Sequence, residues 1–434
     1  MNPFRPIHYL GSKLRLLNVI LETVDSLAQE GEGVLDLFSG SGVVSKGLSN
    51  RHPVIAVDVQ EYARVIASAL LLPFKPLKGF SPSDILNTQV YKSSYKVFEP
   101  LIDFERDALG SIKDSPDQIA ALLEAGPLIA WRTPATTHVP RFDSAVRTVQ
   151  KALERNHDNR SCTLAEYYGG VYFSYEQALL LDACLSMIEK VEPLSRDLFH
   201  AAALSAASDI VNTVGRQFAQ PVTVKRRDGE LKKSILCKIA RDRAIDAATV
   251  FVSWLDKYSA QEQPRHSNHV LCGNYSEAFP VTQGFGTVYA DPPYTRSHYS
   301  RYYHVLETMA RRDRPQITQS NQPMRFAVSK GVYRHDRFMS AFGVRSKAES
   351  AFNELFSLCS QNRLNLVLSY SPYCEEVRSS PRIMTLSQLR ELAARYYVNV
   401  EVVTCGRFTH SKLTTADKQL AASSEAEVLI VARV

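Results

Sequence analysis

Residues 287–294 read Thr-Val-Tyr-Ala-Asp-Pro-Pro-Tyr, a β-branched and aromatic run that stops at a carboxylate, two prolines and a tyrosine. Such a run is typical of a buried strand. Each proline fixes φ and lacks an N–H, and the residue before it is driven out of the helical region. We therefore predict that the Asp291 carboxylate and the Pro292 carbonyl stand on a stiff turn beside the ring of Tyr294. Two fixed acceptors and a ring suit a planar group with an exocyclic amine. An ordinary strand-ending turn would explain these residues taken alone.

A glycine-rich turn between a strand and a helix forms the second motif. Residues 33–37 predict a strand, residues 38–42 (Phe-Ser-Gly-Ser-Gly) the turn, and residues 53–57 a second strand that stops at Asp58. Such a turn lets a ligand approach the backbone, and an acidic residue roughly 20 positions later binds ribose hydroxyls in nucleotide-binding βαβ units. No lysine follows the glycines, as a phosphate-binding loop requires, and Asp36 and Asp58 would repel phosphates. The motif favours a zwitterionic ligand that carries a ribose.

The third motif, residues 9–13 (Tyr-Leu-Gly-Ser-Lys), precedes an amphipathic helix in which Leu14, Leu17, Leu21 and Val24 recur at helical spacing. Backbone N–H groups and a lysine at a helix start can hold a carboxylate. A plain helix cap with a solvated Lys13 is the simpler interpretation of these residues alone.

Composition restricts the possible classes of protein. The chain has 434 residues, 45% of them hydrophobic, and a net charge of +6, which is ordinary for two or three globular domains. No apolar run approaches the roughly 18 residues that a membrane span needs, and residues 1–13 lack the apolar core of a signal peptide. Seven scattered cysteines without a CxxC pair favour reduced thiols in a cytoplasm-like compartment and argue against a zinc site. We therefore expect no bound metal and no membrane anchor.

From about residue 81 the α/β alternation gives way to a mainly helical region. Its aromatic run at residues 167–175 could either stack on bases or pack in a core. Residues 222–235 predict a β-hairpin around an Asp-Gly turn, and the stretch 221–243 holds eight basic and three acidic residues, a local net charge of +5. A hairpin this basic favours contact with phosphates over a plain solvated edge. The residues assigned to this contact are Lys225, Arg226, Arg227, Lys232 and Lys233, together with Arg296.

The alternation resumes with a strand at residues 269–274, and the remaining elements complete an α/β layout. We expect helices at residues 346–359 and 386–396, and strands at residues 364–370, 399–404 and 426–434.

In this order, the motifs at residues 9–13, 36–42 and 291–294 resemble those of the alpha-class amino-methyltransferases that modify adenine N6 in DNA. The resemblance covers residues 5–58 and 270–434, and a helix at residues 198–215 is similar to recognition-side helices of these enzymes. It implies a Rossmann-like α/β methyltransferase sheet with one reversed strand and an inserted, mainly helical target-recognition domain that carries the basic β-hairpin. The expected domains are residues 1–80 (cofactor half), 81–264 (DNA-binding region) and 265–434 (catalytic half).

The resemblance also implies S-adenosylmethionine as the cofactor and S-adenosylhomocysteine as the product. The residues that it places around the cofactor are Tyr9, Gly11, Ser12, Lys13, Asp36, Phe38, Ser39, Gly40, Gly42, Asp58, Asn274 and Asp291. Tyr9 and Lys13 would flank the methionine end, and Asp58 would hold the ribose. Asn274 stands where family members commonly have an aspartate against the cofactor adenine, and its amide can accept from the adenine amine and donate to N1.

For the reaction, the resemblance implies site-specific methyl transfer to adenine N6 of a base flipped out of double-stranded DNA. The residues assigned to the target amine are Asp291, Pro292, Pro293 and Tyr294. A cognate restriction or defence-system component is a further expected partner, in the cytoplasm or nucleoid of a bacterial or phage-type system. Cytosine N4 in DNA and adenine N6 in RNA stay open as targets, and a non-catalytic DNA-binding module stays open as a different class. Glutamine N5 is less favoured because those enzymes usually begin the last motif with Asn.

Overall fold

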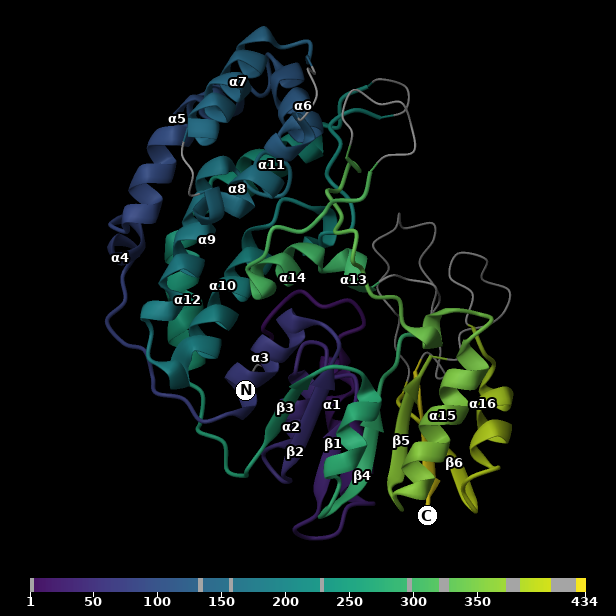
Figure 1. Ribbon diagram of the computed structural model, residues 1–434. Coiled ribbons are helices and arrows are strands. Elements are labelled where there is room, and N and C mark those ends of the chain that lie inside the picture. Colours follow the sequence, from purple (N-terminus) through teal and green to yellow (C-terminus); the bar gives the residue numbers. More distant parts are fainter. Residues whose placement is uncertain are drawn as a thin grey trace. The chain divides into compact units, whose positions relative to one another are not determined.

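The computed structural model describes two compact units (Figure 1). The described residues are 4–131, 136–155, 159–226, 230–294, 299–319, 328–371, 383–406 and 427–434. The first unit consists of Met1–Phe74, Gln261–Ser300 and Phe338–Val434, and the second of Lys75–Ala260 and Arg301–Arg337. The chain thus leaves the first unit twice. The expected boundaries at residues 80 and 264 lie near two of the observed ones, but residues 301–337, assigned above to the catalytic half, pack with the second unit.

The first unit is built on a seven-stranded sheet in the order β3-β2-β1-β4-β5-β7-β6. Its strands are β1 (Gly33–Asp36), β2 (Val54–Asp58), β3 (His269–Cys272), β4 (Phe285–Ala290), β5 (Asn365–Tyr370), β6 (Asn399–Thr404) and β7 (Val428–Arg433). Neighbours pair in parallel except that β7 runs antiparallel to both β5 and β6. The predicted Rossmann-like methyltransferase sheet with one reversed strand is confirmed.

The central strands are apolar along their length because helices cover both faces of a parallel sheet. Val34, Leu35 and Val288 are fully buried. In the register of the sheet, Asp36 pairs with Ala56 of β2 and with Tyr289 of β4. The carboxyl ends of β1, β2 and β4 therefore meet at one edge, which is where ligands bind in open α/β sheets.

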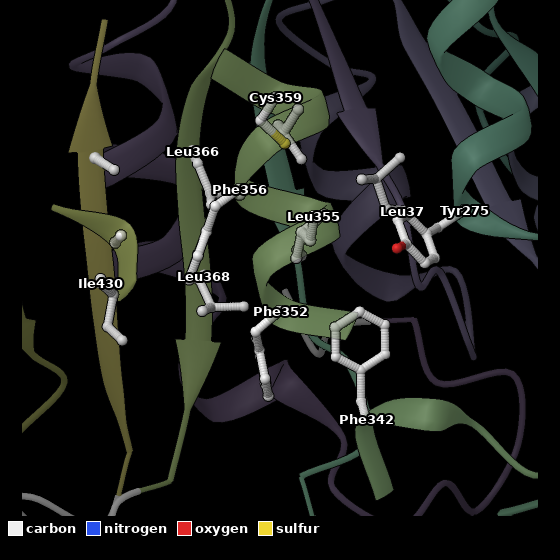
Figure 2. Close-up of a cluster of buried hydrophobic side chains, with 14 of the residues drawn as sticks. Leu37, Tyr275, Phe342, Phe352, Leu355, Phe356, Cys359, Leu366, Leu368 and Ile430 are labelled. Atoms are coloured by element: carbon white, nitrogen blue, oxygen red, sulfur yellow. The ribbon is translucent and has the colours of Figure 1, made fainter. Parts of the chain in front are cut away.

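In the described part of this unit, the sheet is accompanied by the helices α1 (Leu17–Asp25), α2 (Val43–Leu48), α3 (Glu61–Leu71), α15 (Ala348–Gln361) and α16 (Leu386–Ala393). The apolar face of α15 recurs at i, i+3, i+4 and i+7, with Phe352, Leu355, Phe356 and Cys359. Figure 2 shows these side chains next to the strands that carry Leu366, Leu368 and Ile430. Each such buried side chain contributes about 1.5–3 kcal/mol, so α15 fixes this half of the sheet firmly.

The second unit is mainly helical, as the sequence predicts (Figure 1). Its helices are α4 (Pro82–Leu86), α5 (Gln89–Gly110), α6 (Pro116–Ala125), α7 (Pro140–Arg155), α8 (Thr163–Tyr168), α9 (Tyr175–Met187), α10 (Arg196–Ile210), α11 (Lys233–Arg243), α12 (Ala247–Ser259) and α14 (His304–Arg311), with the short α13 (Tyr299–Tyr302) leading into α14. Helix α10 packs on α12, and α5 packs on α7 and α9.

A buried ion pair ties α11 to α5. Arg243 and Glu105 pair with side chains that are 0% and 4% exposed. Arg243 also donates to the Gly170 carbonyl over 2.7 Å, and Glu105 accepts the Tyr175 backbone N–H over 2.8 Å. Since a buried charge is tolerated when it is paired and hydrogen-bonded, Arg243 is a core residue and not part of a basic surface.

The aromatic run at residues 167–175 also lies in the core of the second unit. Tyr168, Tyr172, Phe173 and Tyr175 are fully buried. The Tyr168 hydroxyl lies 2.9 Å from the Thr308 hydroxyl. Of the two interpretations that the sequence leaves open, core packing is the one observed.

The basic hairpin is shorter than predicted. Lys225 bridges Leu231 in an antiparallel pair, and the Lys232 N–H donates to the Val224 carbonyl over 2.8 Å. The expected turn, residues 227–229, lies outside the described residues. Helix α11 begins at Lys233, so the extended pairing ends there instead of continuing to residue 235. The helix expected at residues 198–215 likewise ends early, at Ile210, where the following residue leaves the helical region.

Within the described part of the chain, no helix combines the length and apolarity that a bilayer span requires. No group of three His, Cys, Asp or Glu side chains gathers there as metal ligands would.

Candidate active site

A cavity of about 310 Å³ lies at the carboxyl edge of the sheet, within the first unit. Its walls come from the segments that follow β1 to β4, from residues 9–13 and from residues 338–343. The predicted site residues that line it are Tyr9, Gly11, Ser12, Lys13, Asp36, Phe38, Ser39, Gly40, Asp58, Asn274, Asp291 and Pro293. Gly42, Pro292 and Tyr294 are not among the lining residues. The fold thus brings all three sequence motifs to one cavity.

Asp36, the last residue of β1, is 1% exposed. Its Oδ2 accepts the Ser45 hydroxyl over 2.5 Å, while Oδ1 has no hydrogen-bond partner among the described residues. Burial raises the pKa of Asp36 to about 7, against the lowering effect of the Ser45 hydrogen bond and with the help of the charges on Asp291 and Asp58. A buried carboxyl with an unused oxygen indicates a site for a hydrogen-bond donor from a ligand.

Asp58, the last residue of β2, ties the glycine turn to the neighbouring strand. The Gly40 N–H donates to Asp58 Oδ2 over 2.9 Å, and the Gln60 N–H donates to Oδ1 over 2.9 Å. Burial raises the pKa of Asp58 to about 6, although these backbone hydrogen bonds lower it. Each carboxylate oxygen has a second lone pair, so Asp58 can still accept from the hydroxyls of a ligand.

The glycine turn packs directly against Tyr9. Gly40 has φ +50°, in the left-handed region that favours glycine, and a Cβ there would lie 2.7 Å from the Tyr9 hydroxyl oxygen. Gly42, also left-handed with φ +71°, is the N-cap of α2, and a Cβ there would lie 3.1 Å from Leu70 Cδ1. Both glycines are therefore required by the shape of the turn.

Three aromatic rings form one wall of the cavity. The Phe38 ring centroid lies 5.5 Å from that of Tyr275 and 5.4 Å from that of Phe342. All three residues line the cavity. Sequence reasoning missed Tyr275 and Phe342. The position of Tyr275, in the segment that follows β3, could have identified it, whereas no motif marks Phe342.

Asn274 caps the short 3-10 helix η7 (Tyr275–Val281). Its Oδ1 accepts the Ser276 N–H over 3.2 Å, and its own N–H donates to Glu277 over 2.8 Å. The amide oxygen was expected to accept a hydrogen bond from a ligand, but it already accepts one in the helix cap. The side-chain NH₂ is the group left to donate to a ligand.

Lys13 is buried, at 7% exposure, and is not a solvated cap residue. Its Nζ lies 3.0 Å from Asp291 Oδ1 and 2.8 Å from Glu427 Oε1. Burial opposes the charge, but Asp291 and Glu427 together raise the pKa of Lys13 well above its usual value. The ammonium is thus held by two carboxylates of the protein itself.

Glu427, directly before β7, is a site residue that the sequence analysis did not identify. It is 0% exposed, and its Oε1 accepts the Ser369 hydroxyl over 2.8 Å in addition to Lys13. Lys13 and Glu427 are 414 positions apart, and no motif surrounds Glu427. An acidic residue at the start of an apolar strand was the one available signal.

Asp291, directly after β4, is 21% exposed and meets Lys13 through Oδ1, which leaves Oδ2 to accept from a ligand. Burial raises the pKa of Asp291 to about 6, with Lys13 lowering it and Glu427 raising it. The carboxylate form therefore prevails at neutral pH.

Tyr294 differs from expectation because its ring is buried, at 8% exposure, instead of standing open beside the acceptors. It packs edge-on against Tyr370 with centroids 5.3 Å apart, and its hydroxyl donates to Glu427 Oε2 over 3.5 Å. The Lys13 ammonium lies 5.6 Å from the ring centroid. Apolar packing and the buried carboxylate hold the ring inward, and its assigned role in stacking stays a prediction.

The basic residues assigned to DNA belong to the second unit or lie outside the described residues, as Arg227 and Arg296 do. Lys225 pairs with Asp117 over 2.7 Å, and Lys232 donates to the Thr223 hydroxyl over 2.9 Å. Arg226 and Lys233 are exposed. Part of the predicted positive charge is therefore already paired within the protein.

Comparison with known proteins agrees with this geometry. The family model described as D12 class N6 adenine-specific DNA methyltransferase matches residues 9–96 and 253–364, which include all three motifs. The chain is 25% identical over 413 residues to the modification methylase LlaI of Lactococcus lactis subsp. lactis. The aligned residues make up 92% of this chain and 50% of that protein. The chain thus spans about half the length of this curated relative. Together with the sheet and the cavity, these matches support an adenine-specific DNA methyltransferase family for the chain.

Proposed function

We propose that the chain transfers a methyl group from S-adenosylmethionine to the N6 amine of adenine in double-stranded DNA, with S-adenosylhomocysteine as the second product. The observation that carries this proposal is the position of Asp291, which follows β4 and lines the same cavity as the glycine turn and Asp36. The family match and the printed name of the relative, a modification methylase, support the same reaction.

The cavity fits S-adenosylmethionine in its chemistry. Six buried oxygens of lining residues have no hydrogen-bond partner among the described residues, namely Ser12 Oγ, Asp36 Oδ1, Ser39 Oγ, Gln60 Oε1 and the hydroxyl oxygens of Tyr275 and Tyr289. Carboxylates attract a ligand that carries an ammonium and a sulfonium, and a volume of about 310 Å³ lies within the usual range of ligand sites. Asp36 and residues 9–13 hold the methionine end, Asp58 the ribose, and the rings of Phe38, Tyr275 and Phe342 the adenine. When bound, the cofactor supplies an activated methyl group.

Asp291 binds and polarises the target amine. Its Oδ1 is fixed by Lys13, and its Oδ2 accepts one N–H of the amine. Positive charge develops on the attacking nitrogen in the transition state, so a carboxylate already in place stabilises the transition state more than the ground state. Pro292 and Pro293 contribute by holding the backbone of the turn rigid.

Glu427 prevents Lys13 from neutralising Asp291. With both carboxylates ionised, Lys13, Asp291 and Glu427 carry a net charge of −1, because one ammonium is shared by two carboxylates at 3.0 and 2.8 Å. A buried site with this net charge favours cationic groups and a cationic transition state.

The substrate adenine has to leave the double helix, because its amine is stacked and paired there. In the context that the name of the relative suggests, the modified DNA would be protected from a cognate restriction nuclease.

Replacing Asp291 by asparagine tests the proposal. We expect D291N to lose at least about 100-fold in methyl transfer, the typical cost of removing one preorganised electrostatic group, while its affinity for S-adenosylhomocysteine changes little. Transfer is measured with labelled S-adenosylmethionine and duplex DNA, followed by nucleoside analysis, and affinity by calorimetry. The proposal fails if the wild-type chain methylates cytosine N4 or RNA in place of DNA adenine, or if D291N keeps full activity.

A further inference from the structure

Two arginines of the second unit lie against one tyrosine ring. The guanidinium carbon of Arg301 lies 4.6 Å from the ring centroid of Tyr333, and that of Arg337 lies 5.4 Å from it. Arg301 also donates to the Tyr333 hydroxyl over 2.9 Å, and this hydroxyl donates to the Ala219 carbonyl. The tyrosine is therefore fixed to the backbone and orients both guanidinium groups.

Neither Arg301 nor Arg337 has a carboxylate partner among the described residues. Four other arginines of residues 301–337 have carboxylate partners: Arg311 with Asp313 and Asp336, Arg312 with Glu189, Arg314 with Glu166, and Arg334 with Asp313 and Asp336. The Nε atoms of Arg301 and Arg337 are buried and have no acceptor there, and Arg337 reaches only the Thr318 hydroxyl, at 3.5 Å. The pair thus retains donors that the described residues leave unused.

The positive charge at this pair affects the neighbouring groups. Burial lowers the pKa of Arg337, and the Arg301 guanidinium lowers it further. Burial also lowers the pKa of His304 to about 3, with contributions from Arg337, Arg334 and Arg301. Two partly buried like charges without a counter-charge cost free energy, and a bound anion would remove this cost.

We propose that Arg301, Tyr333 and Arg337 form a binding site for a phosphate group of a nucleic-acid backbone. Planar guanidinium groups present paired N–H donors that match phosphate oxygens, whereas the lysine ammonium of Lys225 is already paired with Asp117. Contacts to phosphates fix the position of a protein on DNA without reading its sequence. That the nucleic acid is DNA rests on the proposed function.

The dependence of DNA affinity on salt tests this site. Each phosphate contact contributes about −0.9 to the slope of log K against log salt concentration, so R301Q and R337Q should each flatten the slope by about that amount on duplex DNA of any sequence. R312Q is the matched control, because Arg312 belongs to the same segment and loses the same charge but pairs with Glu189 on the surface. We expect R312Q to keep the wild-type slope. R337K serves if R337Q does not fold: it keeps the charge and loses the planar fork, so affinity should fall with little change in slope.

Equal slopes for the wild type, R301Q and R337Q would overturn the proposal. Inorganic phosphate is the second probe: if it binds to the wild type and not to R337Q while the DNA slopes stay equal, the site takes a free anion and the proposal is also overturned. The assay needs no cofactor, so the two proposals can fail separately. Suppose that R301Q and R337Q both flatten the salt slope but the wild type transfers no methyl group. The proposed function alone would then be refuted.

Discussion

At the residue scale, the division of charge among Lys13, Asp291 and Glu427 determines what Asp291 can do. Glu427 lies outside the residues that the family model matches, and it is fully buried between Lys13 and Ser369. Without its charge, Lys13 would have Asp291 as its one carboxylate partner in the described site. The acceptor for the target amine would then be closer to neutral, and its electrostatic effect on the transition state would decrease.

We predict that E427Q lowers the rate of methyl transfer at pH 8 by about ten-fold or more, equivalent to roughly 1.4 kcal/mol in the barrier. The carboxylate of Asp291 is the active form, so the wild-type rate falls as pH drops through its pKa of about 6. Since the Glu427 charge raises that pKa, its removal should move the acidic limb of the profile to lower pH. Single-turnover rates between pH 5 and 9 measure both effects. The control is E401Q, the same change at a residue of β6 that forms a surface ion pair with Arg433 of β7. An acidic limb that stays in place would contradict the prediction.

Asp36 leads to a prediction about stability as well as binding. Its pKa in the folded protein is about 7, against an ordinary value of 3.8, so ionisation is harder in the folded state. Its contribution to stability is therefore complete at low pH and is lost as pH rises from about 4 to about 7. At pH 8, D36N should make the ligand-free protein more stable, by up to about 4 kcal/mol at 1.36 kcal/mol per pKa unit, while weakening the binding of S-adenosylhomocysteine.

Thermal unfolding at pH 8 and calorimetry measure the two effects of D36N. Opposite changes in stability and affinity are expected because the site holds a buried charge whose favourable partner is the ligand. A variant that is less stable than the wild type, or that binds the product equally well, would show that Asp36 is ionised at no cost or does not contact the ligand.

At the scale of elements, the glycine turn separates the effect of backbone conformation from that of ligand contact. Gly40 and Gly31 both have positive φ, at +50° and +86°, but a Cβ at Gly40 would meet the Tyr9 ring, while one at Gly31 would meet nothing within 4 Å. Both G40A and G31A should lose about 1–2 kcal/mol of stability through left-handed strain, and G40A should lose more because its Cβ would displace the Tyr9 ring. Only G40A should also lose affinity for S-adenosylhomocysteine, by calorimetry. Equal affinities in the two variants would place the ligand away from the turn.

The strands were predictable because a covered parallel sheet demands apolar, β-branched runs. The run predicted at residues 399–404 is β6, and that at residues 53–57 is β2 shifted by one residue. The hairpin was predicted too long because alternation over residues 230–235 was taken as strand. In the structure, Leu236 and Ile239 are buried at a helical spacing, and this burial starts α11 at Lys233.

At the scale of the whole molecule, the sequence predicts those parts of the site that follow directly from strand ends. Asp36, Asp58 and Asp291 belong to this group, because each stands where a buried run stops. The inserted helical unit was also predictable, from the break in the α/β alternation. The return of residues 301–337 to that unit was not, because a helix such as α14 carries no local sign of which core it joins. Glu427 and the buried ring of Tyr294 depend on contacts across long stretches of chain, which no local pattern records.

The arrangement of strands also has a consequence for protein synthesis. β1, at residues 33–36, pairs with β2 on one side and with β4, at residues 285–290, on the other, so its second neighbour does not exist until residues 75–260 of the second unit have been translated. At about 5–20 residues per second, the nascent β1 and β2 wait roughly 10 to 50 s with apolar side chains such as Val34 and Leu35 uncovered. Exposed apolar surface and unpaired strand edges make a chain prone to aggregation, so we expect this interval to be the most vulnerable stage of its synthesis.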